Sequence, residues 1–177
     1  MVHAPESRFP SPTPVQMGAS DIERHAEAIA GSYGFSPETD SIKELVRTIG
    51  GGIDILEFAD EQQLEGGSLE VYGPYEFRIY LSPVTSFVRD NFTIAHALGH
   101  YFLHSGSPPG SRQISAGRWG TSLVEQQANR FAAALLMPRA RFGEVAKRLN
   151  YSLPVLAGRF NVSEQAASFR LKSLGMG

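Results

Sequence analysis

Residues 89–104 have the sequence RDNFTIAHALGHYFLH. Within this stretch His96, His100 and His104 recur at every fourth position among mostly apolar neighbours. On an α-helix, residues four apart lie on the same face, one turn above the other. The spacing therefore predicts a largely apolar helix over 85–104 that carries imidazole rings along one face.

His96 and His100 form a candidate metal site. Two imidazoles one turn apart can share one ion, and zinc accepts neutral histidine nitrogens among about four tetrahedral ligands. Burying both rings in an apolar helix without a partner would be unfavourable. A histidine pair at this spacing also arises by chance, so a further ligand has to support the interpretation. His104 lies about 80° around the helix from His96, an awkward position for a third ligand to the same ion.

Glu125 is the candidate third ligand, because it is the only Asp or Glu between residues 91 and 143. It stands near the start of a second predicted helix, over 122–137, in which the following residues are mostly apolar or small. A carboxylate that points inward from this helix would complete the site. The alternative is an exposed glutamate in the first turn, where the helix dipole favours negative charge.

The remaining pattern predicts an α+β fold. Helices come first, then a small sheet, then helices again, and this order is typical of that class. The expected elements are helices over 20–31 and from 37–39 to 49, strands over 53–58, 68–72 and 76–81, and short helices in the last forty residues.

Residues 1–19 contain four prolines and show no periodicity, so we expect a disordered, extended arm. Residues 20–175 then form a single domain that includes a C-terminal helical segment over 151–175. The whole chain has 177 residues, a length that suits one domain with an appended arm.

Composition excludes several classes of site. The chain has no cysteine, which rules out disulfides, cysteine-ligated zinc, iron–sulfur clusters and a cysteine nucleophile. No apolar run approaches the roughly 20 residues that span a bilayer, and the N-terminus does not have the pattern of a signal peptide. We expect a soluble, cytoplasmic protein without a membrane partner.

Positive charge gathers at the C-terminal end. Residues 139–177 carry seven Lys and Arg against two acids, whereas residues 1–138 carry nine against sixteen. A basic end can contact an acidic partner or nucleic acid, but clusters of this size are also common on solvated helical faces, which is the interpretation we prefer.

The segment from Ala157 to Leu171 has the pattern of a helix-turn-helix, with Ser163 as the cap of the second helix. Two short packed helices need the same pattern. We therefore treat direct DNA binding as unlikely and a docking surface for a protein substrate as the better use of this segment.

Together, residues 89–104 and the stretch EQQANRFAAALLMP at 125–138 resemble the ImmA/IrrE family of zinc metallopeptidases. Residues 156–175 resemble the C-terminal end of the same family. The resemblance implies a minimal zincin-like domain, with a small, mostly antiparallel sheet packed on helices. It implies Zn²⁺ held by His96, His100 and Glu125, with water or substrate in the fourth position. By analogy with the fold, strand 76–81 would be an edge that aligns an extended substrate.

The sequence departs from the family at the centre of the chemistry. The family motif is His-Glu-x-x-His, in which the glutamate is the general base for the zinc-bound water. Ala97 stands at that position, and a methyl group cannot accept a proton. Since general-base catalysis contributes about 10²–10⁴-fold, we predict that this chain binds zinc but cleaves little or nothing. Ala97 is either an engineered substitution or the mark of a natural pseudoprotease. We favour the engineered change because the other site residues are intact.

The resemblance implies a zinc endopeptidase that cleaves a helix-turn-helix transcriptional repressor. The alternative is a pseudoprotease that sequesters a repressor or an antitoxin-like partner without cutting it. A DNA-binding regulator that acts through its C-terminal helices is a third, weaker hypothesis. Histidine and carboxylate ligands also suit manganese or iron. His104 either lines the cleft or caps the C-terminal end of its helix.

Overall fold

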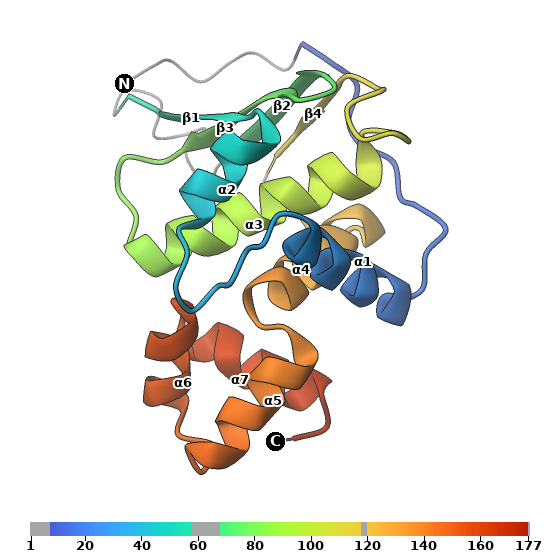
Figure 1. Ribbon diagram of the computed structural model, residues 1–177. Coiled ribbons are helices and arrows are strands. Elements are labelled where there is room, and N and C mark those ends of the chain that lie inside the picture. Colours follow the sequence, from blue (N-terminus) through green and yellow to red (C-terminus); the bar gives the residue numbers. More distant parts are fainter. Residues whose placement is uncertain (1–7, 58–67, 118–119, 177) are drawn as a thin grey trace.

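The computed structural model describes residues 8–57, 68–117 and 120–176. A small sheet lies at one end of the molecule above α3, and the C-terminal helices lie at the opposite end (Figure 1). The elements in chain order are α1 (Ala19–Ser32), α2 (Ile42–Ile49), β1 (Gly52–Ile55), β2 (Ser68–Gly73), β3 (Glu76–Leu81), α3 (Phe87–His104), β4 (Ile114–Ala116), α4 (Leu123–Leu136), α5 (Arg139–Arg148), α6 (Leu153–Phe160) and α7 (Glu164–Ser173).

The sheet has the strand order β1-β3-β2-β4. β1 pairs with β3 in parallel, and β2 pairs with β3 and with β4 in antiparallel register. The predicted α+β class and the mostly antiparallel sheet are thus confirmed. The expectation that strand 76–81 forms an edge is wrong, because β3 has a partner on each side. The edge strands are β1 and β4.

Alternation along the strands builds the core beneath the sheet. Leu69 and Val71 of β2 and Phe77 and Ile79 of β3 are all buried on the inner face. The ring of Phe77 stacks on Tyr101 of α3, with ring centroids 4.3 Å apart. Apolar side chains at every second position therefore fix the sheet on top of α3, the helix that carries the histidines.

Serine caps set the start of the two central helices. The Ser86 side chain accepts a hydrogen bond from the Arg89 N–H at the start of α3. The Ser122 side chain accepts one from the Glu125 N–H at the start of α4. Each cap satisfies one of the free N–H groups in a first turn, so both helices begin within two residues of the predicted positions.

Two elements differ from the sequence-based expectation. α2 begins at Ile42 rather than at 37–39, because the backbone N–H of Ser36 donates to the Asp40 carboxylate and holds the intervening residues in a turn. β4 was not predicted at all. It has three residues, too few to show a period, and it exists because it pairs with β2. The end of the predicted strand 53–58 lies outside the described residues.

Residues 8–18 of the N-terminal arm lie extended along the surface. The Ser115 N–H of β4 donates to the Pro10 carbonyl over 3.1 Å, and the Phe9 N–H donates to the Ser115 hydroxyl over 3.2 Å. Val15 and Met17 pack against the core. The extended form agrees with the proline content of this segment. Residues 1–7 lie outside the described part of the chain.

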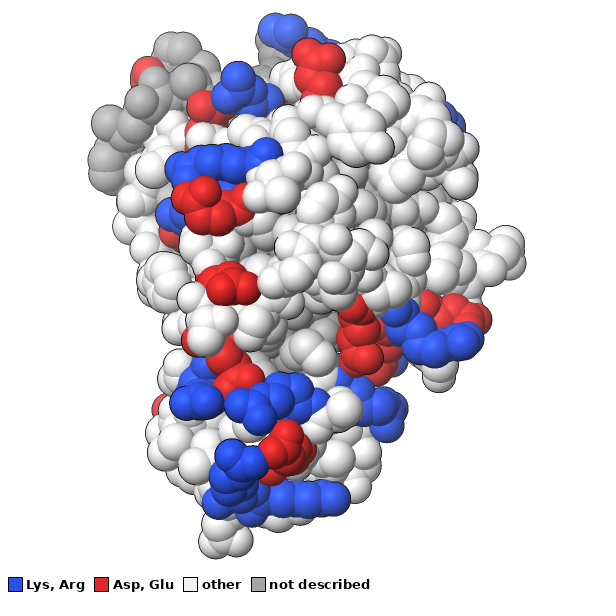
Figure 2. Space-filling model, in the orientation of Figure 1, with Lys and Arg blue, Asp and Glu red and all other residues white. Residues whose placement is uncertain are grey.

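Lys and Arg side chains gather over the C-terminal helices, with acidic side chains among them (Figure 2). Most of these cations form ion pairs with carboxylates. Glu38 contacts Arg141 and Arg159, and Glu144 contacts Arg141 and Arg148. Pairing of this kind fits the solvated helical face that the composition favoured.

We expect Glu38→Gln to lower the free energy of unfolding by about 1 kcal/mol at neutral pH. The hydrogen bond from Arg141 lowers the pKa of the Glu38 carboxyl, with Arg159 acting in the same direction and burial opposing both. A folded-state pKa below the unfolded value contributes stability above the unfolded pKa. That stability is lost as pH falls through the folded pKa. In urea unfolding, the difference between the two proteins should therefore shrink in acid, and a constant difference would contradict this account.

Candidate metal centre

Three ligand atoms from α3 and α4 converge in the core. The Nε2 atoms of His96 and His100 lie 3.0 Å apart. Glu125 places Oε2 3.0 Å from the first of them and Oε1 3.3 Å from the second. All three residues are buried, and Glu125 is only 9% exposed. The carboxylate therefore points inward, and the alternative of an exposed first-turn glutamate does not describe this structure.

The two helices meet because residue 99 is glycine. A Cβ built on Gly99 would lie 2.9 Å from the Ala128 carbonyl oxygen and 3.0 Å from the Ala128 Cα. A side chain of any size would thus collide with the backbone of α4. Gly99 sits between the two histidines in sequence, so this close approach also sets the distance from both rings to Glu125. This glycine was not predicted from the sequence to be part of the site.

We expect Gly99→Ala to lower the free energy of unfolding by about 1–3 kcal/mol, the usual range for an overpacked contact. It should also weaken zinc binding, since α4 has to move away with Glu125. Urea unfolding and zinc titration would measure both effects. Gly158→Ala is a matched control, because nothing lies within 4 Å of a Cβ at this helical glycine. A Gly99→Ala protein as stable as this control would contradict the close-packing argument.

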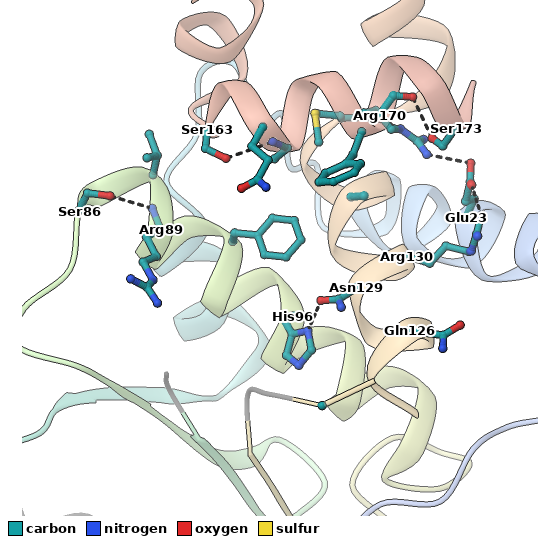
Figure 3. Close-up of a pocket in the computed structure, with 18 residues that line it drawn as sticks. Glu23, Ser86, Arg89, His96, Gln126, Asn129, Arg130, Ser163, Arg170 and Ser173 are labelled. Atoms are coloured by element: carbon teal, nitrogen blue, oxygen red, sulfur yellow. Dashed lines mark hydrogen bonds and ion pairs between the residues drawn. The ribbon is translucent and has the colours of Figure 1, made fainter. Parts of the chain in front are cut away.

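The outer nitrogen of His96 has a partner. His96 Nδ1 lies 2.8 Å from the amide oxygen of Asn129 (Figure 3). An amide oxygen only accepts hydrogen bonds, so Nδ1 carries the proton and Nε2 keeps a lone pair directed at Glu125. Asn129 follows Glu125 by four residues and hence lies on the same face of α4. That spacing was visible in the sequence, although Asn129 was not predicted as part of the site.

The arrangement of lone pairs fits a bound cation. His96 Nε2 and Glu125 Oε2 are 3.0 Å apart, yet Oε2 is buried without a hydrogen-bond partner. Both atoms are acceptors, so their closeness is unfavourable unless a positive ion accepts both lone pairs. Two imidazole nitrogens and one carboxylate oxygen are donors that suit zinc. The residues present therefore fit the metal.

The protonation states at neutral pH are those that a metal needs. Burial lowers the pKa of His100. It also lowers the pKa of His104 to about 4, despite the opposing hydrogen bond to Gln127. The His100 and His104 rings are thus neutral at pH 7, and the neutral imidazole is the form that can coordinate a metal.

Ala97 follows the first histidine and lies in the apolar core, with 5% of its surface exposed. Its methyl group can neither accept nor donate a proton. The local structure thus holds ligands for an ion and offers no general base at this position.

A cavity of about 840 Å³ opens beside His96 between α3, α4 and α7. Its walls carry apolar side chains from all three helices, among them Phe92, Ala133 and Phe169. Pockets of a few hundred to about a thousand Å³ are the usual size for a bound ligand. The last helix is therefore a wall of the cavity that His96, one of the candidate ligands, also lines.

Arg170 of α7 is buried rather than available to a nucleic acid. Its side chain is 1% exposed, its Nη1 lies 3.1 Å from a Glu23 carboxylate oxygen, and its Nε donates to the Met137 carbonyl. The predicted cap is present, because the Ser163 side chain accepts a hydrogen bond from the Ala166 N–H. The helix-turn-helix pattern thus forms two short helices, and its central arginine holds them to α1 and α4.

Comparison with known proteins agrees with this fold. Residues 52–172 match the model of the Peptidase_M78 family, described as the IrrE N-terminal-like domain. A solved structure described as a Mycobacterium tuberculosis transcriptional regulator aligns with a TM-score of 0.59 and 20% identity. The alignment covers 86% of this chain and 46% of that protein, so this chain spans less than half of its length. A search of curated proteins found no match. None of the described helices combines the length and apolar character needed to cross a bilayer.

Proposed function

Because the chain belongs to the Peptidase_M78 (IrrE N-terminal-like) family, we propose that it is a zinc-binding protein of the ImmA/IrrE type whose partner is a helix-turn-helix transcriptional repressor. Such a repressor acts in the cytoplasm, and we propose the same location for this chain. Family membership supports metallopeptidase chemistry. The form with glutamate at position 97 would be an endopeptidase.

The observation that carries the proposal is the buried group of His96, His100 and Glu125, whose Nε2 atoms and carboxylate oxygens lie 3.0–3.3 Å from one another, a spacing that one shared cation would satisfy. A zinc ion bound there would supply a Lewis acid that polarises water and a scissile carbonyl. The cavity beside His96 would hold the partner's polypeptide, and Asn129 would keep His96 in its binding orientation.

Ala97 favours a second candidate function for this exact chain, namely binding of the partner without cleavage. The ligands and the cavity are intact, whereas the proton acceptor is absent. A protein of this design can sequester a repressor or an antitoxin-like partner. Direct DNA binding receives no support from Arg170, whose guanidinium is buried against Glu23.

Metal content tests the proposal directly. We expect elemental mass spectrometry of the dialysed protein to find about one zinc per chain. His100→Ala should lose the metal, because only two ligands remain. His25→Ala is the matched control, since this histidine lies on α1 outside the cluster and should leave the zinc in place. Zinc absent from the unchanged protein, or retained by His100→Ala, would refute the site.

A further inference from the structure

The ring of His100 is held from behind by a chain of buried polar groups. Its Nδ1 lies 3.1 Å from Nδ1 of His104. On the far side of that ring, His104 Nε2 lies 3.1 Å from the side-chain oxygen of Gln127. His100 is 0% exposed, His104 1% and Gln127 5%. Water therefore has little access to these groups, and the contacts among them have to satisfy one another.

The N-terminal arm fixes the orientation of Gln127. The Val15 N–H donates to the Gln127 oxygen over 3.1 Å, and the Gln127 NH₂ donates to the Val15 carbonyl over 2.8 Å. This pair of bonds admits one orientation of the amide, with its oxygen toward His104. A carbonyl oxygen has two lone pairs, so it accepts from both Val15 and His104.

The position of each proton follows from this orientation. Because Gln127 offers His104 an acceptor, His104 Nε2 carries a proton. In the neutral ring, His104 Nδ1 then carries a lone pair instead of a proton. The short contact between the two Nδ1 atoms therefore requires a proton on His100 Nδ1. His100 Nε2 consequently carries no proton, and its lone pair faces His96 and Glu125. The opposite order of protons would place a hydrogen on the atom that has to bind the metal.

We propose that His104, Gln127 and the backbone of Val15 are positioning residues of the metal centre, which act by fixing the proton of His100 on Nδ1 and its lone pair on Nε2. This inference rests on the proposed zinc site. It assigns a role to His104, the third histidine of the sequence motif. It also gives the N-terminal arm a role at that site, because Val15 supports Gln127 although the two residues are 112 positions apart in the sequence. Partners that hold the outer nitrogen of a ligating histidine typically strengthen metal binding by about 10–100-fold.

The tautomers can be measured in the unchanged, metal-free protein. Long-range ¹H–¹⁵N NMR spectra of the imidazole rings distinguish a proton on Nδ1 from one on Nε2. We expect His104 as the Nε2–H form and His100 as the Nδ1–H form. The reverse assignment for either ring would overturn the proposal. This measurement needs neither a substitution nor zinc. It therefore tests the proposed proton positions of His104 and His100 even if the proposed function fails.

Zinc titration then tests the consequence. Gln127→Met has a similar side-chain length but offers His104 no acceptor, and we expect zinc affinity to fall by about 10–100-fold. The neighbouring Gln126→Met is the matched control, because Gln126 is exposed and donates to the Thr121 carbonyl instead. Equal zinc affinities of these two variants would overturn the positioning role. Failure of the unchanged protein to bind zinc would refute the proposed function and not the tautomer assignment.

A pair of substitutions at His104 provides a second test. His104→Leu removes the acceptor for the His100 proton and should weaken zinc binding to a similar extent. His104→Asn places an amide oxygen near the position of Nδ1 and should restore most of the affinity. A merely structural role would not follow this order, since Leu fills the apolar surroundings better than Asn does. If the His104→Leu protein binds zinc as tightly as the His104→Asn protein, the proposed positioning role of His104 is wrong.

Discussion

Ala97→Glu is expected to raise peptide cleavage by about 10²–10⁴-fold over the unchanged chain, the range that a positioned general base contributes. The structure places Ala97 directly after the first ligand on α3, where a carboxylate could accept a proton from metal-bound water. The candidate ligands His96, His100 and Glu125 are already together, so we expect a proton acceptor to be the missing part.

The size of the added side chain is the main alternative cause of any effect, because Ala97 is nearly buried. Ala97→Gln is therefore the matched control. It adds the same volume but cannot act as a base, and it should remain as inactive as the unchanged chain. Zinc content measured on each variant shows that the site has survived the substitution.

Cleavage can be followed without a known substrate. A proteome-derived peptide library would be incubated with each zinc-loaded protein, and mass spectrometry would identify new termini. Cleavage at new sites by the Glu variant alone supports the missing-base account. If the unchanged chain cleaves as fast as the Glu variant, Ala97 is not a defect, and another group performs the proton transfer.

The sequence was sufficient to predict that His96, His100 and Glu125 come together, and the reason is local. His96 and His100 stand one helical turn apart, and Glu125 is the only Asp or Glu between residues 91 and 143. The helical spacing of the histidines and the scarcity of acidic residues therefore left few candidates for the site. The same logic would have found Asn129, four residues after Glu125 on the same helix.

Other features depend on contacts that no local pattern encodes. Strand 76–81 was expected at an edge, yet β3 lies between two other strands. It pairs in parallel with β1 on one side and with β2 on the other, although β2 comes before it in the chain. Gln127 supports His104 only because Val15 orients its amide, and a run of prolines gave no sign of that contact. The role of Gly99 became visible only when the backbone of α4 was placed beside it.

Glu125→Gln is expected to abolish zinc binding while it stabilises the metal-free protein. Loss of a charged ligand should weaken zinc binding by more than the roughly 100-fold that loss of an outer partner can cause. In the metal-free protein, however, the Glu125 carboxylate faces the Nε2 atoms of His96 and His100, which carry lone pairs in the tautomers that we infer. An amide N–H at the same place can donate to one of them, and we expect the free energy of unfolding to rise by about 1–2 kcal/mol.

Thermal unfolding with chelator and with excess zinc would show both effects. The unchanged protein should gain about 4 kcal/mol at a zinc concentration a thousand times its Kd, and the Gln variant should gain nothing. Glu164→Gln is the matched control, because Glu164 also lies in the first turn of a helix but is exposed. The Glu164→Gln protein shows how much stability is lost when a first-turn carboxylate no longer interacts with the helix dipole. This loss opposes the rise in the free energy of unfolding that we expect for Glu125→Gln.

The sign of the change in the metal-free protein is the decisive part of this prediction. An ordinary buried ion pair loses stability when its carboxylate becomes an amide, because the remaining partner is left without its counter-charge. A group of acceptors built for a cation gains stability from the same substitution, because the repulsion among its lone pairs falls. A Glu125→Gln protein less stable than the unchanged chain in chelator would mean that His96 and His100 are held by the carboxylate itself. The cluster would then be a structural ion pair rather than a metal centre.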